Sequence, residues 1–183
     1  SRRLGRMNIA ILGAGAWGTA LATTLASRHS VVLWARNPAL IDALAASREN
    51  ARYLPGIPLN PALGLKVHLA EAVAHARTGI LIIAAPIAGL RPIVQVLKDH
   101  APSNLVWLCK GFEQDTALLP HQVVQQVLGT DVPLGALSGP SFALEVAQGL
   151  PCALTIGSAS ATLRHQVVAA IHGANLQIGR AHV

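Results

Sequence analysis

A length of 183 residues predicts a single domain, because globular domains take about 100 to 200 residues. Hydrophobic residues make up 52% of the chain and charged residues 12%, a composition that excludes intrinsic disorder and low complexity. The net charge of +6 depends on the ends, because without Arg2, Arg3, Arg6 and Arg180 ten basic residues remain against eight acidic ones. Aromatic residues make up only 3%, so a basic stripe with interleaved aromatic side chains is missing and we expect no nucleic-acid partner.

Cysteine spacing and hydropathy exclude further classes of protein. Cys109 and Cys152 do not form a CxxC motif, and His and Cys do not recur at metal-ligand spacing, so we expect reduced thiols and no metal site. The most apolar run, Gly79–Leu90, is shorter than the roughly 20 residues of a membrane-spanning helix and contains Pro86. Since no cleavable signal peptide is visible either, we expect a cytoplasmic protein without a membrane span.

The order of apolar runs and helical patterns predicts the fold. Buried strands are expected at Asn8–Leu12, Val31–Ala35, Gly79–Ala84, Leu105–Cys109, Leu134–Leu137 and Ala153–Ile156, with a shorter one at Val67–Leu69. Helices are expected from Gly18 to Ser27, from Asn37 and Pro38 to Ser47, and at Arg91–His100, Leu119–Leu128, Phe142–Gln148 and Ala161–His172. The stretch 50–65, rich in Pro, Gly and Asn, is predicted to be a loop. This alternation is typical of an α/β fold with a doubly wound, mostly parallel, Rossmann-like sheet.

A glycine-rich turn, Gly13-Ala14-Gly15-Ala16-Trp17-Gly18, links the first expected strand to the first expected helix. In this context a G-x-G-x-x-G sequence is typical of dinucleotide binding. Gly13 permits the sharp turn, Gly15 lets the backbone approach the pyrophosphate, and Gly18 lets the helix pack close to the strand. The helix N-terminus then offers N–H groups to the phosphates. The alternative is a turn that only needs glycine at positive φ.

The residue about 20 positions after the turn bears on the choice between NAD and NADP. A site that prefers NAD carries an acidic residue there for the ribose hydroxyls, but this sequence reads Trp34-Ala35-Arg36-Asn37. Arg36 is placed to meet a 2′-phosphate and to stack on adenine, so we expect NADP or NAD as the cofactor. A solvated surface arginine is the alternative, and Trp34 is expected in the core.

Both ends of the chain differ from the pattern between them. Residues 1–6 precede Met7 and are expected to be a non-native or disordered extension, while residues 7–177 are expected to form the NAD(P)-binding domain. The last six residues, 178–183, read IGRAHV, which matches a translation of the start of a common sequencing adapter. We therefore expect an artefactual tail there, and the nucleotide sequence of the gene tests this.

Five segments extend the signal of the glycine-rich turn: GAGAWGTALA at 13–22, LWAR at 33–36, NARYLPGI at 50–57, KGFE at 110–113 and GPSFALEVAQGLP at 139–151. In this order and spacing they resemble the NAD(P)-dependent glycerol-3-phosphate dehydrogenases. The resemblance implies reduction of dihydroxyacetone phosphate to sn-glycerol 3-phosphate with NAD(P)H, which feeds glycerophospholipid synthesis. It further implies the N-terminal domain of such an enzyme, with the C-terminal helical domain absent, and allows a homodimer for the full-length protein.

The resemblance also assigns roles to single residues. Lys110 matches a lysine that contacts substrate and cofactor, and it is the catalytic residue we expect in this chain; a strand-end lysine exposed to water is the alternative. Gly139 and Ser141 match substrate contacts, and Ser141 is also expected to cap the helix that follows. The cofactor contacts that the resemblance adds to the three glycines are Ala16, Trp17, Arg36, Pro86, Lys110 and Ala143.

Some positions fall outside this pattern. Ala16 stands where serine is frequent in the family, so one phosphate contact is expected to be missing, and Cys152 stands where threonine is more common. Glu145, one helical turn beyond Ser141, suits a structural or a functional carboxylate equally. The sequence also holds histidines that match no motif and that we expect on the surface, namely His29, His75 and His121.

Catalysis in the resembling family needs residues that this sequence does not contain. The proton donor there is a second lysine, carried with an arginine–asparagine phosphate clamp on the helical domain, and no lysine follows Lys110 in this chain. We therefore expect the chain alone to be inactive. Two alternatives stay open, another reductase of the same superfamily and a non-catalytic module that senses NAD(P).

Overall fold

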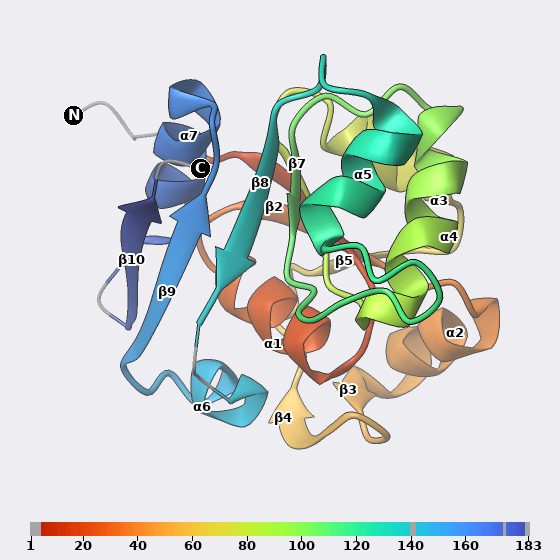
Figure 1. The fold of residues 1–183 in the computed structure, drawn as a ribbon. Coiled ribbons are helices and arrows are strands. Elements are labelled where there is room, and N and C mark those ends of the chain that lie inside the picture. The colour runs from red at the N-terminus through yellow and green to blue at the C-terminus, as the bar shows by residue number, and fades with distance from the viewer. Residues whose placement is uncertain (1–4, 140–141, 174, 182–183) are drawn as a thin grey trace.

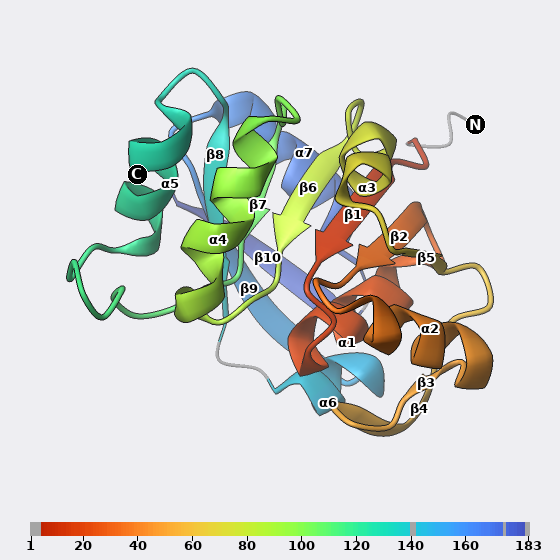
Figure 2. The same cartoon turned by 90° about the vertical axis from the view of Figure 1, so that its right-hand side faces the viewer.

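A single eight-stranded sheet forms the centre of the molecule, with helices on both faces (Figures 1 and 2). The structure is a computed structural model that describes residues 5–139, 142–173 and 175–181. The sheet contains β1 (Asn8–Leu12), β2 (Ser30–Trp34), β5 (Gly64–Lys66), β6 (Ile80–Ile83), β7 (Leu105–Trp107), β8 (Leu134–Ser138), β9 (Cys152–Gly157) and β10 (Leu176–Ala181). Two further strands, β3 (Glu49–Asn50) and β4 (Leu54–Pro58), pair with each other in a separate small sheet.

The strand order is β10-β9-β8-β7-β6-β1-β2-β5, and most neighbours are parallel. The exception is β9, which runs antiparallel to β8. The chain moves from β1 towards β5 and then returns to β6 on the other side of β1, so the direction of winding reverses between β1 and β6. Ligands of doubly wound sheets bind at such a reversal, outside the carboxyl ends of the strands. The predicted doubly wound, mostly parallel α/β fold is confirmed.

Two layers of helices cover the sheet. The helices are α1 (Ala16–Leu25), α2 (Pro38–Ser47), α3 (Leu69–His75), α4 (Ile87–Lys98), α5 (Pro120–Leu128), α6 (Ala143–Ala147) and α7 (Ala161–Ile171). Strand β1 shows how one strand supplies both cores: Ile9 and Ile11 pack with residues of α1 and α7, whereas Ala10 and Leu12 pack with residues of α3, α4 and α5. Alternate side chains of a strand point to opposite faces, and burial on both faces explains the continuous apolar runs of the sequence.

Local signals in the sequence predicted several element boundaries correctly. Helix α2 begins at Pro38 after Asn37, whose side-chain oxygen accepts a hydrogen bond from the Ala39 backbone N–H at 3.0 Å. An N-cap side chain of this kind satisfies an amide that the helix leaves without a partner. Trp34 is buried as expected, and its indole N–H donates to the Val67 carbonyl oxygen.

The region between β2 and β6 differs most from the prediction. The stretch 50–65 is not only loop, because it contains β4, the end of β3 and the start of β5. The expected strand at Val67–Leu69 lies instead at Gly64–Lys66 and pairs with β2, while Leu69 begins a helix that was not predicted. Short elements of this kind are fixed by tertiary packing rather than by their own pattern, as the burial of Leu54 and Leu63 indicates.

The helix expected at Arg91–His100 begins earlier, at Ile87, with Pro92 inside it. Proline removes a hydrogen-bond donor from a helix. Burial of Leu90, Val94 and Leu97 on one face nevertheless holds the helix against the sheet across this position.

One of the expected surface histidines is buried. His29 is 5% exposed and joins three parts of the chain. Its Nδ1 accepts from the Met7 backbone N–H at 3.0 Å, and its Nε2 lies 2.8 Å from the Ala170 carbonyl oxygen at the end of α7. A backbone N–H can only donate, so Nδ1 is the acceptor, Nε2–H is the donor, and the ring is neutral. The surface prediction for His29 was therefore wrong, because both ring nitrogens find partners inside the fold.

Strand β10 lies at the edge of the sheet and pairs in parallel with β9 from Leu176 to Ala181. It begins inside the predicted domain, 7–177, and continues into the expected tail, and the origin of that tail stays a prediction. None of the helices formed by the described residues is long and apolar enough to cross a membrane.

Candidate functional site

The turn after β1 leaves no room for side chains at two of its glycines. Gly13 has a φ of +120°, and a Cβ there would lie 2.2 Å from the Ala84 carbonyl oxygen. A Cβ on Gly18 would lie 1.8 Å from the Gly13 carbonyl oxygen. These geometries match the expected sharp turn and the expected close packing of helix on strand.

Gly15 differs from Gly13 and Gly18, because a Cβ on Gly15 would meet no atom within 4 Å. It is the N-cap residue of α1, and no side chain forms a capping hydrogen bond at this helix end. The first backbone N–H groups of α1 therefore face open space beside a residue without a side chain. Such a cradle fits a phosphate group, which the N–H groups and the positive end of the helix dipole attract.

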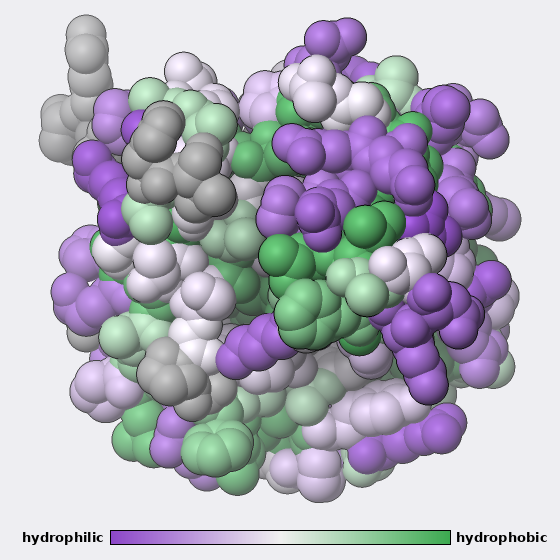
Figure 3. All heavy atoms as spheres, viewed as in Figure 1, coloured by the Kyte–Doolittle hydropathy of each residue, from purple (hydrophilic) through white to green (hydrophobic). Residues whose placement is uncertain are grey.

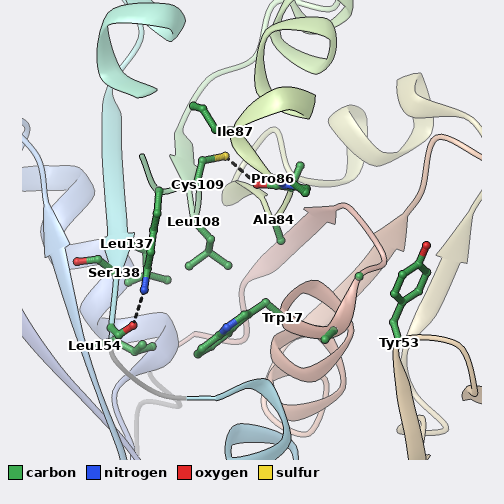
Figure 4. Close-up of a pocket in the computed structure, with 15 residues that line it drawn as sticks. Trp17, Tyr53, Ala84, Pro86, Ile87, Leu108, Cys109, Leu137, Ser138 and Leu154 are labelled. Atoms are coloured by element: carbon green, nitrogen blue, oxygen red, sulfur yellow. Dashed lines mark hydrogen bonds between the residues drawn. The ribbon is translucent and has the colours of Figure 1, made fainter. Parts of the chain in front are cut away.

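Two adjoining cavities lie on either side of this turn, at the carboxyl edge of the sheet. The smaller has a volume of about 340 Å³ and the larger of about 610 Å³. The residues that line both are Gly15, Tyr53, Ala84, Ala85 and Pro86. Figure 4 shows the larger cavity, with the Trp17 side chain below Ala84 and Leu108 in that view. The turn that was expected to hold a pyrophosphate thus separates two spaces of the same groove.

The predicted site residues divide between these cavities. Gly13 and Arg36 line the smaller one, and Arg36 is exposed there. The predicted residues that line the larger one are Ala16, Trp17, Lys110 and Gly139, and both cavities share Gly15 and Pro86. Gly18 and Ala143 are not among the lining residues: Gly18 lies beneath the turn, and Ala143 is buried in the core at the start of α6. Ser141 lies outside the described residues.

Lys110 follows β7 at the far end of the larger cavity. Its Nζ donates to the Gly139 carbonyl oxygen at 3.0 Å, which places two predicted substrate contacts side by side (Figure 4). The preceding Cys109 donates its thiol hydrogen to the Ala85 carbonyl oxygen at 3.0 Å. Burial raises the pKa of the Cys109 thiol to about 11, so the thiol stays protonated at neutral pH and keeps this donor.

The last residue of the KGFE segment forms an ion pair with α4. Both carboxylate oxygens of Glu113 accept from the Arg91 guanidinium, at 2.9 Å each, and one of them also accepts from the Thr116 hydroxyl at 2.6 Å. The hydrogen bonds from Arg91, followed by the bond from Thr116, lower the pKa of Glu113. The carboxylate is therefore ionised and held against α4.

Two residues of the 50–57 segment belong to the site although no role was predicted for them. The Asn50 side chain is 1% exposed, and its Nδ2 donates to the Ala14 carbonyl oxygen at 2.9 Å and to the Thr19 hydroxyl at 2.8 Å. Asn50 thereby ties β3 to the glycine-rich turn, and Tyr53, three residues on, reaches both cavities. The NARYLPGI motif was the signal for them, but only the fold shows which side they face.

Glu145 has a structural contact in the described region. Its carboxylate accepts a hydrogen bond from the Phe142 backbone N–H at 3.3 Å, at the start of α6. Across the described ranges, no group of three or more His, Cys, Asp or Glu side chains is arranged to hold a metal ion.

Comparisons with known proteins agree with this geometry. Residues 8–164 match the family described as NAD-dependent glycerol-3-phosphate dehydrogenase N-terminus. The chain is 58% identical over 173 residues to the glycerol-3-phosphate dehydrogenase [NAD(P)+] of Herminiimonas arsenicoxydans, covering 94% of this chain and 52% of that protein. The relative from Janthinobacterium sp. (strain Marseille) is also 58% identical, with the same coverage. The chain thus spans about half the length of the curated relatives it matches.

Solved structures of glycerol-3-phosphate dehydrogenases share the fold of this chain. The crystal structure of glycerol-3-phosphate dehydrogenase from Coxiella burnetii superposes with a TM-score of 0.87 at 32% identity, over 94% of this chain and 53% of that one. The Plasmodium falciparum enzyme, at 23% identity and a TM-score of 0.84, shares the fold over 97% of this chain and 53% of that one. With a family match over more than half its residues, this chain belongs to the NAD-dependent glycerol-3-phosphate dehydrogenase N-terminal family.

Proposed function

We propose that this chain binds NAD(P) and forms the dinucleotide-binding part of an enzyme that reduces dihydroxyacetone phosphate to sn-glycerol 3-phosphate. The observation that carries the proposal is the pair of cavities that meet at Gly15, with Arg36 in one and Lys110 in the other. Family membership supports the choice of reaction. The relatives from Herminiimonas and Janthinobacterium are glycerol-3-phosphate dehydrogenases [NAD(P)+], which supports both cofactors.

The cavities suggest one direction for the cofactor. The adenosine would lie in the smaller cavity beside Arg36, and the pyrophosphate would lie against Gly13, Gly15 and Ala16 at the N-terminus of α1. The nicotinamide would then enter the larger cavity towards Trp17, Pro86 and Lys110. Gly18 and Ala143 would support this arrangement from below, through packing of α1 and α6.

Residues of the larger cavity would bind the substrate. When bound, the nicotinamide supplies the hydride that reduces the substrate carbonyl. The Lys110 ammonium would attract the substrate phosphate or carbonyl oxygen, with Gly139 and Ser141 as further contacts. The walls formed by Leu108, Leu137 and Leu154 are apolar and would exclude water, which strengthens the attraction of Lys110 for an anion.

The same proposal assigns the proton donor to the other half of the full-length protein. Reduction of a ketone needs an acid within hydrogen-bond reach of the forming alkoxide. The resemblance to the dehydrogenases implies a second lysine for this step, and no lysine follows Lys110. We therefore expect this chain to bind dinucleotide without turnover.

The test combines a binding and a turnover measurement. The chain should bind NADPH or NADH in a fluorescence titration and show no NADPH oxidation with dihydroxyacetone phosphate, while the full-length gene product should oxidise NADPH. Turnover by the chain alone, near that of the full-length product, would show that the acid has been misplaced. A full-length product that binds NADPH but reduces only a different carbonyl compound, such as a keto acid, or no substrate, would replace the proposal with another reductase or a sensing module.

For the full-length protein we infer a cytoplasmic homodimer that supplies sn-glycerol 3-phosphate for glycerophospholipid synthesis. Support comes from the family and from the two cysteines, which are both free thiols, as is usual in a reducing compartment. Sedimentation analysis of the full-length product tests the dimer, and a monomer at micromolar concentration would contradict it.

A further inference from the structure

The Arg91–Glu113 ion pair joins two neighbouring segments that both line the larger cavity. Arg91 lies on α4, four residues after Ile87, and Glu113 lies three residues after Lys110. Ile87 and Lys110 both line the cavity. The ion pair thus connects the loop that carries Lys110 to α4, whose first residue lines the same cavity.

Three hydrogen bonds hold the Glu113 carboxylate, two from Arg91 and one from the Thr116 hydroxyl. Arg91 Nε bonds one oxygen, and an outer nitrogen of the same guanidinium bonds the other, a two-point geometry that fixes the plane of the carboxylate. Glu113 also organises the loop that follows, because its N–H donates to the Leu118 carbonyl oxygen and its own carbonyl accepts from the Ala117 N–H, at 2.8 Å each. Hydrogen bonds therefore hold both the side chain and the backbone of Glu113 in place.

Without Arg91, this carboxylate would be the nearest anion to Lys110 along the chain. Residues three positions apart have Cα atoms no more than about 11 Å apart. That is close to the distance of about 10 Å over which salt screens charges. A released Glu113 would attract the Lys110 ammonium and repel an anionic ligand. In the structure Lys110 donates instead to the Gly139 carbonyl oxygen inside the cavity.

We propose that Arg91 and Glu113 are positioning residues for Lys110. By holding the Glu113 carboxylate against α4, Arg91 keeps this anion away from the Lys110 ammonium, which stays available to a phosphorylated ligand in the larger cavity. The phosphate-binding role of Lys110 rests on the proposed function, whereas the restraint of the Glu113 carboxylate by Arg91 does not. The hydrogen bond from Cys109 to the Ala85 carbonyl oxygen is a second contact between the same two segments.

Chemical labelling of lysine measures this effect on the chain itself. Pyridoxal 5′-phosphate is an aldehyde with a phosphate; a lysine amine adds to its carbonyl carbon, water leaves, and borohydride reduces the resulting imine to a stable secondary amine. The chain has three lysines, Lys66, Lys98 and Lys110, so mass spectrometry of peptides gives the labelling rate of Lys110 against two internal references.

The expected order of the Lys110 labelling rates among the variants distinguishes a charge effect from a loss of structure. Arg91→Ala should slow labelling of Lys110 about fourfold, as a released carboxylate at the surface is worth a few-fold. Glu113→Gln should change it by less than about twofold. The double variant should label like Glu113→Gln, because the second substitution removes the anion that the first one releases. Arg91→Lys, which keeps the charge without the two-point contact, should lie between wild type and Arg91→Ala.

Controls separate this result from loss of structure. Arg77→Ala removes the same charge before the amino end of β6, where the Arg77 guanidinium donates to the His100 and Ala101 backbone oxygens, and it should leave Lys110 unchanged. A structural role alone predicts that the double variant labels at least as abnormally as either single one, with Lys66 and Lys98 changed too. That outcome, or an unchanged Lys110 in Arg91→Ala, overturns the inference. Failure of the chain to bind NADPH, or of the full-length product to oxidise it with dihydroxyacetone phosphate, would overturn the proposed function but not this order.

Discussion

The two ends of the candidate site are held by different kinds of contact. At the glycine-rich turn, backbone packs against backbone so closely that Gly13 and Gly18 admit no side chain, and the buried Asn50 amide adds two hydrogen bonds. At the Lys110 end, side-chain hydrogen bonds and the Arg91–Glu113 ion pair connect exposed or half-buried segments. The surface around that end is apolar: Phe112 is 63% exposed, and Figure 3 shows hydrophobic residues over the loop between β7 and α5 and beside α6.

This difference explains how each end can be changed. Close backbone packing makes the turn rigid before any ligand arrives, so its substitutions divide sharply into those that damage the fold and those that damage binding. The contacts of Lys110, Arg91 and Glu113 can be removed one at a time, with small effects on folding, because these side chains remain in part hydrated.

The largest effect is expected at Gly18. Gly18→Ala forces a methyl group against the Gly13 carbonyl oxygen and should lower the free energy of unfolding by about 3 kcal/mol, measured by urea denaturation. Gly89→Ala is the matched control, because its Cβ would meet only the Ala85 side chain at 3.4 Å within α4. That control should leave stability unchanged or slightly raised. Equal stability of the two variants would contradict the close packing at the turn.

A smaller effect is expected at Arg36, at the open side of the smaller cavity. Arg36→Ala should weaken binding of NADPH by about 2 kcal/mol, because a charge-assisted hydrogen bond to the 2′-phosphate is lost. Binding of NADH should change much less, and Arg36→Lys should recover part of the NADPH affinity. Calorimetric titration of both cofactors measures the difference. An equal loss for both would mean that Arg36 acts by stacking on adenine or not at all.

The smallest effect is a pH dependence of stability at His29, away from the site. Burial is the largest effect on His29 and lowers its pKa below the usual 6.5. The hydrogen bond to Ala170 opposes this shift, and repulsion from Arg28 and Arg6 adds to it. The unfolded chain therefore binds the proton more readily, and the stability present above pH 6.5 is lost as the pH falls through the folded-state pKa. Protonation of Nδ1 would also break the bond from Met7.

Between pH 7 and pH 5.5 the loss at His29 should be no more than about 1 kcal/mol. Urea denaturation across this range measures it, and His29→Gln, which does not titrate, should show a shallower slope than wild type. Identical slopes for both proteins would show that another group carries the pH dependence.

Local geometry could be predicted from the sequence, whereas contacts between residues far apart in the chain could not. Short-range signals such as Asn37-Pro38 and the glycine-rich turn specify local geometry, and the structure has both where expected. The burial of His29 was not predictable, because its partners Met7 and Ala170 are 22 and 141 residues away. The path of residues 50–65 depends in the same way on Asn50, which bonds residues 36 and 31 positions away. The family motifs marked these residues without showing what they contact.

The most direct test of the proposed dinucleotide site is a calorimetric titration of NADPH into the wild-type chain and into Gly15→Ala. Gly15 has φ −76° and ψ −168°, which alanine also adopts, and its Cβ meets no protein atom, so the variant should unfold at the wild-type urea concentration. The added methyl group would occupy the space proposed for the pyrophosphate. We predict one NADPH bound per wild-type chain and an affinity at least about tenfold lower in Gly15→Ala. Wild-type affinity in the variant, or no binding by the wild-type chain, would contradict the account.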